Sequence, residues 1–135
     1  MYDPRKDQEL VDIIQARLAV LNPDAEPYED DGQMTWLLLL GDELPDNLSA
    51  YEAQQAGYNV VDVSFEITSG EEAYGEEGGY AIGWIACRPG GEILAQCQPY
   101  NYTGRVWTED KDELWYRAES VIDSLLDYEK EICNG

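Results

Sequence analysis

The chain has 135 residues, 44% of them hydrophobic, and its 29 acidic and 8 basic residues give a formal net charge of −21. That size and apolar content predict a single folded domain over residues 1–135 instead of a disordered chain. The charge disfavours direct binding to nucleic acid or to anionic membranes, and the absence of histidine excludes Ser–His and Cys–His catalysis and histidine-ligated metals.

The first predicted element is a helix over residues 4–21. Asp3 and Pro4 supply a helix cap and a proline at the first helical position. Leucine and isoleucine then recur at helical spacing, and Asn22-Pro23 ends the pattern.

An acidic connector and a short apolar run follow this helix. Residues 24–32 contain EPYEDDG, which has turn-forming residues and too little apolar content to pack, so they predict a solvated loop. Residues 34–40 read MTWLLLL between Gly32 and Gly41, which predicts a strand buried on both faces.

The middle of the chain predicts a short helix and then a strand. Ser49 and Glu52 form a capping-box pattern, and Gly57 stands where a helix would end, so a helix over 49–56 is expected. Residues 58–68 then alternate between apolar and polar side chains, which predicts a strand with one solvated face.

A hairpin is predicted from residues 80–87 and 92–98, joined by a Pro-Gly turn. Pairing Cys87 with Glu92 places all the apolar side chains of both strands on one face. The same register puts Cys87 and Cys97 on opposite faces, so a disulfide between them is not expected.

The last elements are a short strand within residues 99–107 and a C-terminal helix over 109–132, which carries an apolar stripe at helical spacing. Together these elements predict an α+β fold. In it, an antiparallel sheet of three to five strands packs against the N-terminal and C-terminal helices.

Motifs that would indicate catalysis or cofactor binding are missing. The sequence has no Walker loop and no GxGxxG, and with 29 acids some carboxylate pairs are expected by chance. The acidic run from Glu29 to Gly32 lacks the ligand spacing of a calcium loop. We therefore expect no enzymatic activity, no cofactor and no metal site.

The compartment is predicted from the apolar runs and the cysteines. No apolar run approaches 18 residues, which argues against a signal peptide and a membrane span. Cys87, Cys97 and Cys133 lack zinc-site spacing and are interpreted as free thiols in a reducing compartment. A cytoplasmic location follows, which would be the host cytoplasm for a viral protein.

The distribution of charge carries the functional prediction. No lysine or arginine lies between Arg17 and Arg88, whereas fifteen acids do. The segment GEEAYGEEGGY, residues 70–80, has four glutamates and no cation. Considered alone it is typical of a loop kept soluble by its charge.

The neighbouring strand changes this interpretation. Asp62 and Glu66 lie on its polar face, and residues two apart on a strand are about 6.8 Å apart, similar to the phosphate spacing of a nucleic-acid strand. A sheet edge continued by the loop would then form an anionic track. The candidate partner-binding residues are Asp62, Glu66, Glu71, Glu72, Glu76, Glu77, Glu29, Asp30 and Asp31.

The function predicted from these features is a non-catalytic inhibitor that mimics nucleic acid and blocks the cationic site of a nucleic-acid-processing protein. The chain is similar in general character to the DNA-mimic proteins of phages and plasmids that block restriction enzymes or CRISPR effectors. Its expected partner is a basic protein, either a nucleic-acid-binding effector or a nuclease.

Three alternatives remain open at this point. Acid-rich composition is also typical of proteins adapted to a saline cytoplasm. An immunity protein that neutralises a basic nuclease toxin would share the partner chemistry, and a structural role in an assembly would give defined oligomers. The sequence leaves the oligomeric state open.

Overall fold

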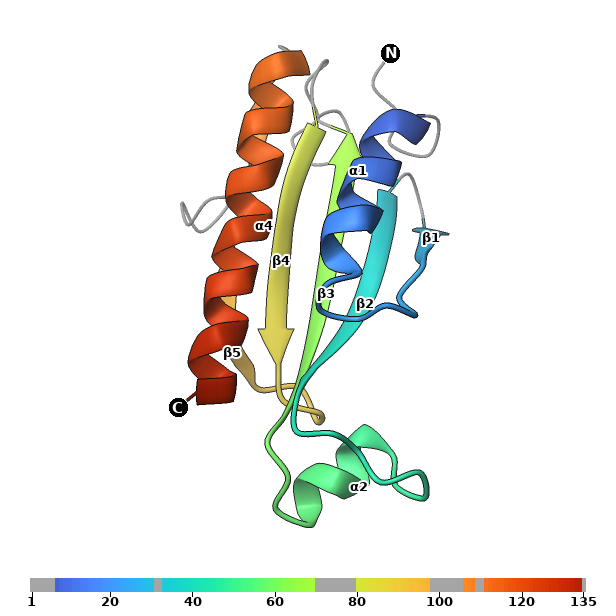
Figure 1. Cartoon of the computed structure of the whole chain (residues 1–135), viewed down its shortest axis with the longest axis vertical. Helices are drawn as coiled ribbons and strands as arrows, with labels where there is room; N and C mark the ends of the chain where they lie inside the picture. Colours follow the sequence, from blue (N-terminus) through green and yellow to red (C-terminus); the bar gives the residue numbers. More distant parts are fainter. Residues whose placement is uncertain (1–6, 31–32, 70–79, 98–105, 109–110, 135) are drawn as a thin grey trace.

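The structure is a computed structural model that describes residues 7–30, 33–69, 80–97, 106–108 and 111–134. It shows the predicted α+β fold (Figure 1). The elements in chain order are α1 (Gln8–Leu18), β1 (Pro27–Asp30), β2 (Gln33–Gly41), α2 (Ala50–Gln55), β3 (Val60–Ser69), β4 (Tyr80–Cys87), β5 (Ile93–Cys97), β6 (Val106–Thr108) and α4 (Lys111–Asn134).

The strands form one antiparallel sheet in the order β1-β2-β3-β4-β5. β6 is off this path and pairs with β4 as well. β5 pairs with residues 84–87 of β4 and β6 with residues 80–82, so the two short strands share the same edge of β4. The six strands therefore fill five positions across the sheet, within the predicted range.

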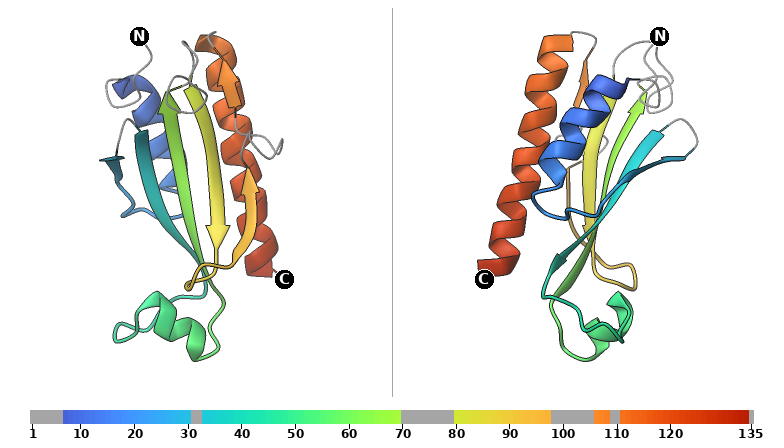
Figure 2. Two further views of the ribbon diagram at one scale, coloured as in Figure 1. Left: turned by 180° about the vertical axis from the view of Figure 1, so that it is seen from behind. Right: turned by 45° about the vertical axis from the view of Figure 1, so that its right-hand side comes forward.

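Two layers make up the molecule. α1 and α4 both lie on one face of the sheet, and the view from behind shows that none of the described helices covers the opposite face (Figure 2). α2 belongs to the connection between β2 and β3 and lies beyond the end of the sheet (Figure 1). On that opposite face of the sheet Leu37 is 60% exposed, whereas Thr35, Thr68 and Ala81 are buried, so only part of the face is open to other molecules.

The hydrophobic core fills the space between the helices and the sheet. Trp36 of β2 pairs with Phe65 of β3, which in turn pairs with Trp84 of β4, so three aromatic side chains form one row across the sheet. α1 and α4 contribute apolar stripes at helical spacing. The helices supply the buried side chains Leu10, Val11, Ile14, Leu18, Ala118, Val121, Ile122 and Leu125.

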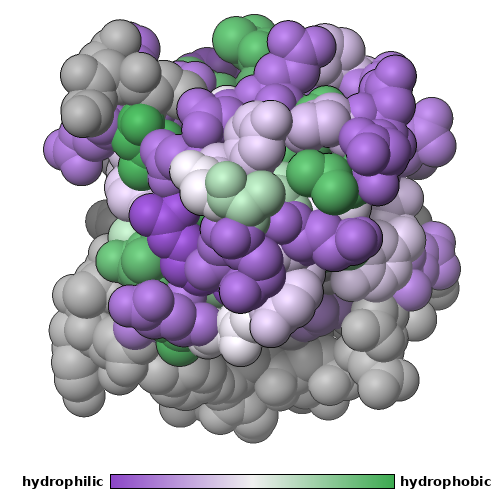
Figure 3. All heavy atoms as spheres, turned by 90° about the horizontal axis from the view of Figure 1, so that it is seen from below, coloured by the Kyte–Doolittle hydropathy of each residue, from purple (hydrophilic) through white to green (hydrophobic). Residues whose placement is uncertain are grey.

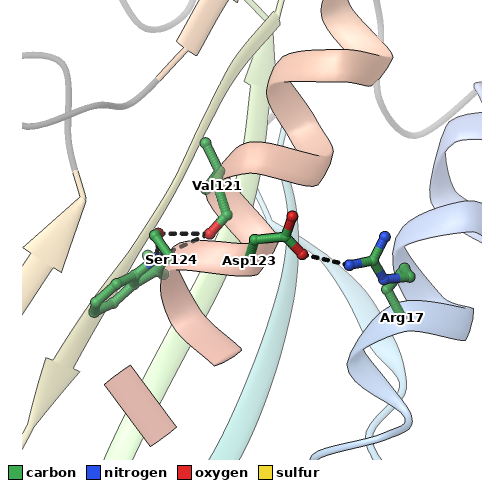
Figure 4. Close-up of polar contacts among 5 residues, drawn as sticks. Arg17, Val121, Asp123 and Ser124 are labelled. Atoms are coloured by element: carbon green, nitrogen blue, oxygen red, sulfur yellow. Dashed lines mark hydrogen bonds and ion pairs between the residues drawn. The ribbon is translucent and has the colours of Figure 1, made fainter. Parts of the chain in front are cut away.

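Polar contacts tie α4 to α1 and to the sheet (Figure 4). Arg17 of α1 forms an ion pair with Asp123 of α4 at 2.5 Å. Because both side chains are partly exposed, this pair contributes at most about 1 kcal/mol. On the sheet side of α4, the indole N–H of Trp84 donates to Ser124 Oγ at 3.0 Å, which satisfies a buried donor.

The ends of α2 agree with the prediction, whereas α1 ends at Leu18 instead of residue 21 and α4 at Asn134 instead of residue 132. Ser49 and Glu52 form the predicted capping box at α2, and Gly57 has the expected positive φ of 99°. α1 begins at Gln8, with the Asp7 side chain accepting from the Leu10 N–H at 3.2 Å. The predicted start at Asp3-Pro4 lies outside the described residues, as do residues 109 and 110 before α4.

Two strand predictions were wrong for reasons of tertiary structure. Part of the connector 24–32 forms β1, because the backbone of residues 27–30 pairs with the edge of β2 whatever its side chains. The strand β2 is not buried on both faces: Leu37 is 60% exposed, because helices cover only one side of the sheet.

The β4–β5 hairpin also differs from the predicted register. The Arg88 N–H donates to the Glu92 carbonyl at 2.8 Å, closing a tighter turn in which two glycines have positive φ. Cys87 therefore pairs with Ile93 instead of Glu92, and an irregularity after Ala86 shifts the pairing again.

The predicted separation of the cysteines is nevertheless confirmed. Cys97 is buried in the core, Cys87 lies on the other face beside Asp62, and no disulfide joins them. Of the strand predicted within 99–107, only β6 falls in the described residues. None of the described helices is long and apolar enough to cross a membrane.

Candidate functional site

The structure places the predicted partner-binding residues on different parts of the molecule. Asp62 and Glu66 lie on the helix-free face of β3, because their neighbours Val63 and Phe65 enter the core. Glu29 is paired with Met34, a core residue, so Glu29 lies on the helix-covered face of the sheet, opposite to Asp62 and Glu66. The structure therefore brings Asp62 and Glu66 together on one face and separates Glu29 from them.

The other predicted residues add less. Asp30 is paired with Gln33 at the end of β1. Asp31, Glu71, Glu72, Glu76 and Glu77 lie outside the described residues. The predicted sheet edge was wrong, because β3 is the central strand of the sheet and has β2 and β4 on its two sides. Asp62 and Glu66 are thus presented by the face of the sheet.

Positive charge is absent from the sheet itself. None of the six strands in the described part of the chain contains a lysine or an arginine. The described arginine side chains are used elsewhere: Arg17 pairs with Asp123, and Arg88 donates to Asn59 Oδ1 at 2.6 Å and to the Val60 carbonyl at 3.0 Å. The acids of the helix-free face therefore have no cation on any strand.

A hollow of about 480 Å³ lies on this face across β2, β3 and β4. The register explains its walls, because Leu37, Ser64 and Ile85 lie side by side, and Asp62 is directly opposite Cys87 on the adjoining strand. The complete lining consists of Leu37, Leu38, Asp62, Val63, Ser64, Ile85 and Cys87. The hollow is thus apolar with one carboxylate, one hydroxyl and one thiol.

Asp62 is the charged group of this hollow. Burial against the apolar walls raises the pKa of its carboxyl above the ordinary 3.8, although the side chain still reaches solvent. No other described residue forms a hydrogen bond or ion pair with it. A carboxylate that is partly desolvated and unpaired has electrostatic energy to gain from an incoming cation.

We expect the replacement Asp62→Asn to raise the melting temperature at pH 7. A folded-state pKa above the unfolded value stabilises the fold below pH 3.8, and this stabilisation is lost as the pH rises through the folded pKa. The gain should therefore be present at neutral pH, shrink as the pH falls through the folded-state pKa, and be absent below pH 3.8. Thermal melts followed by circular dichroism across this pH range measure it.

Asp46→Asn is the matched control, because it removes one charge from an exposed site outside the hollow. It reports the relief of general repulsion in a chain of net charge −21. Equal gains in the two variants at every pH would show that desolvation of Asp62 does not affect stability.

Sequence reasoning missed the apolar part of this site. Leu37 belongs to the run LLLL, whose members look equivalent in sequence, and nothing in the sequence connects Ile85 or Cys87 with Asp62. The sequence contained one weak signal for apolar neighbours of Asp62. The strand over residues 34–40 was predicted to have apolar side chains on both faces and to lie in the same sheet as Asp62. Which of them adjoin Asp62 depends on the register between strands.

A second acidic surface surrounds α2. Asp42, Glu43, Asp46 and Glu52 are all exposed there, and seen from this end hydrophilic residues surround small separate hydrophobic patches (Figure 3). Tyr51 is 56% exposed on the same helix. The negative surface therefore extends beyond the sheet face to the α2 end of the molecule.

Metal binding has no support among the described residues, where no group of three histidine, cysteine or acidic side chains is placed to hold an ion. None of the protein-family models, curated protein sequences or solved structures compared with this chain matches it. Fold and site define the class of the molecule: an acidic two-layer α+β domain with one helix-free sheet face. That class and its charge are the basis for the proposal below.

Proposed function

We propose that this protein is a non-catalytic inhibitor that binds the cationic nucleic-acid site of a protein partner. The single observation that carries the proposal is the segregation of charge. The six described strands contain acids and no cation, and the helix-free face presents Asp62 without a partner. Anionic groups without internal partners favour association with a lysine- and arginine-lined cleft.

The kind of partner follows from the same chemistry. Proteins that bind DNA or RNA derive much of their affinity from neutralising phosphates with lysine and arginine. A folded acidic surface competes for those side chains. An effector of host defence, such as a restriction enzyme or a CRISPR nuclease, has such a cleft, so the inhibitor we propose is of the anti-restriction or anti-CRISPR type.

Competition with DNA tests the proposal directly. The full chain is immobilised, a bacterial lysate is applied at low salt, and bound proteins are eluted first with neutral dextran, then with duplex DNA, then with high salt. We expect DNA, and not dextran, to release a nucleic-acid-processing protein. The purified partner should then lose a fluorescent DNA probe when the wild-type chain is added.

The glutamates of residues 70–80 are expected to contribute to this interface. Changing Glu71, Glu72, Glu76 and Glu77 to lysine should weaken binding to the purified partner more than about tenfold at moderate salt, because repulsion replaces attraction. Fluorescence anisotropy competition measures the change.

The control variant changes Asp12, Glu119, Asp127 and Glu131 to lysine. These four acids lie on α1 and α4, and the alteration in net charge is the same. An equal loss of affinity in both variants would show that total charge, and not the position of these glutamates, determines binding.

The alternatives give different results in the same experiments. A salt-adapted protein would lose much of its stability in low-salt melts and would capture no partner released by DNA. An immunity protein would capture one toxin nuclease and block its activity. Release by salt alone, with a fold that melts in low salt, would overturn the inhibitor proposal.

A further inference from the structure

The hollow beside Asp62 has the chemistry of a side-chain receptor. Its aliphatic walls are formed by the side chains of Leu37 and Ile85, and Asp62 supplies a carboxylate at one position on its rim. Its volume of about 480 Å³ lies in the range of small-ligand sites, about 300–1,000 Å³. An occupant that matches both parts needs an apolar stem and a cationic end.

We propose that this hollow on the helix-free face receives one arginine or lysine side chain of the partner protein, with its aliphatic stem against Leu37 and Ile85 and its cation at Asp62. This inference rests on the proposed function and specifies its anchor point. Long basic side chains characteristically bury their methylene groups along apolar surface while the charged end stays polar.

Charge complementarity selects this occupant over an uncharged one. Desolvation raises the pKa of Asp62, and no described residue pairs with it, so a neutral apolar group would increase that desolvation without compensation. A guanidinium or ammonium at the rim would instead form a charge-assisted hydrogen bond, the stronger kind.

Of the arginines whose side chains are described, Arg88 is adjacent to the lining of the hollow in sequence, but it does not fill this role. Arg88 follows Cys87 directly, but its guanidinium is held by Asn59 Oδ1 and the Val60 carbonyl. The carboxylate of Asp62 therefore remains available to a cation from outside.

Short blocked peptides test the receptor without the partner. The probes are acetyl-Gly-Xaa-Gly-amide peptides in which Xaa is arginine, lysine, citrulline or norleucine, so that each cation has a neutral analogue of similar shape. Methyl NMR signals of Leu37 and Ile85 in the full-length protein report occupancy. We expect millimolar affinity for such small probes, with arginine binding about tenfold more tightly than citrulline.

Two variants separate the pocket carboxylate from general charge. Asp62→Asn should bring the arginine-to-citrulline ratio close to one. Glu66→Gln removes the same charge from the same face of β3, outside the lining of the hollow, and should keep the preference. A third variant, Leu37→Ala, should weaken arginine and citrulline alike by several-fold, because it removes wall area that both use.

Three outcomes would overturn the receptor: no methyl shift at millimolar peptide, equal affinity for arginine and citrulline, or the same loss from Asp62→Asn and Glu66→Gln. These failures are separable from failure of the proposed function. DNA-released capture of a partner with no peptide binding would remove the receptor alone. Peptide binding without any DNA-released partner would retain the receptor and reject the inhibitor.

Discussion

Replacing Trp36 with alanine is expected to lower the free energy of unfolding by about 3–5 kcal/mol, a large part of the total of about 5–15 kcal/mol for an ordinary domain. Trp36 is completely buried, and its ring meets Phe65 edge-on with the centroids 6.1 Å apart. The substitution creates a cavity between the sheet and α1 and removes an aromatic pair.

The substitution also removes the first of two consecutive hydrogen bonds that run through Gln15. The indole N–H of Trp36 donates to Gln15 Oε1 at 2.7 Å, and Gln15 Nε2 donates to the Ala25 carbonyl at 2.6 Å. These bonds join β2 to α1 and to the segment before β1. Alanine at position 36 would leave the Gln15 acceptor without its partner, which adds to the cost of the cavity.

Urea unfolding followed by far-ultraviolet circular dichroism measures this change without depending on tryptophan fluorescence. Leu37→Ala is the matched control, because the neighbouring side chain points to the other face and is 60% exposed. Its expected cost is below about 1 kcal/mol. A similar loss in both variants would contradict the one-sided core.

The replacement Gly41→Ala is expected to cost more than about 3 kcal/mol. Gly41 ends β2 with a φ of 102°, a region that side-chain-bearing residues rarely adopt. A Cβ there would lie only 2.0 Å from the Asn59 carbonyl oxygen. The backbone that joins β2 to β3 would have to separate, although the Asp42 N–H donates to that same carbonyl at 2.8 Å.

Gly57→Ala separates the clash from the backbone strain. Gly57 has nearly the same φ, 99°, but no atom lies within 4 Å of the position of an added Cβ. Its cost should therefore stay near the strain alone, about 1–3 kcal/mol. Chemical denaturation of both variants gives the difference, and equal costs would show that the contact with Asn59 relaxes freely.

Gly41 and Gly57 are expected to differ in their effect on the hollow of the helix-free face. Gly41 and Asn59 bring β2 and β3 together at the end where α2 is attached. The hollow lies on the same two strands and on β4, between Leu37, Asp62 and Ile85. A shift between β2 and β3 would change its walls, so Gly41→Ala should also weaken arginine-peptide binding, whereas Gly57→Ala should not.

Several features of the fold could be predicted because each depends only on residues that are close together in the sequence. The capping box of Ser49 and Glu52, the glycine at position 57, and the alternation through Val61, Val63 and Phe65 each need only neighbouring residues. The same holds for the apolar stripe of the last helix. Such local signals gave the α+β class and most of the element positions.

The errors arose where distant segments meet. β1 forms because β2 offers an edge to the acidic connector, and no local pattern in EPYEDDG indicates that. The β4–β5 register depends on how Gly90 and Gly91 close the turn. Leu37 looks like its neighbours in LLLL, and its exposure follows from the absence of a helix on that face.

The sequence by itself determined the charge, the lack of histidine, the cation-free stretch between Arg17 and Arg88, and the alternation that puts Asp62 and Glu66 on one face. Only the tertiary structure decided that this face carries no helix and that Leu37 and Ile85 adjoin Asp62. The reason is physical. Composition and periodicity act within one segment, whereas desolvation of a carboxylate depends on side chains that strand pairing brings from elsewhere in the chain.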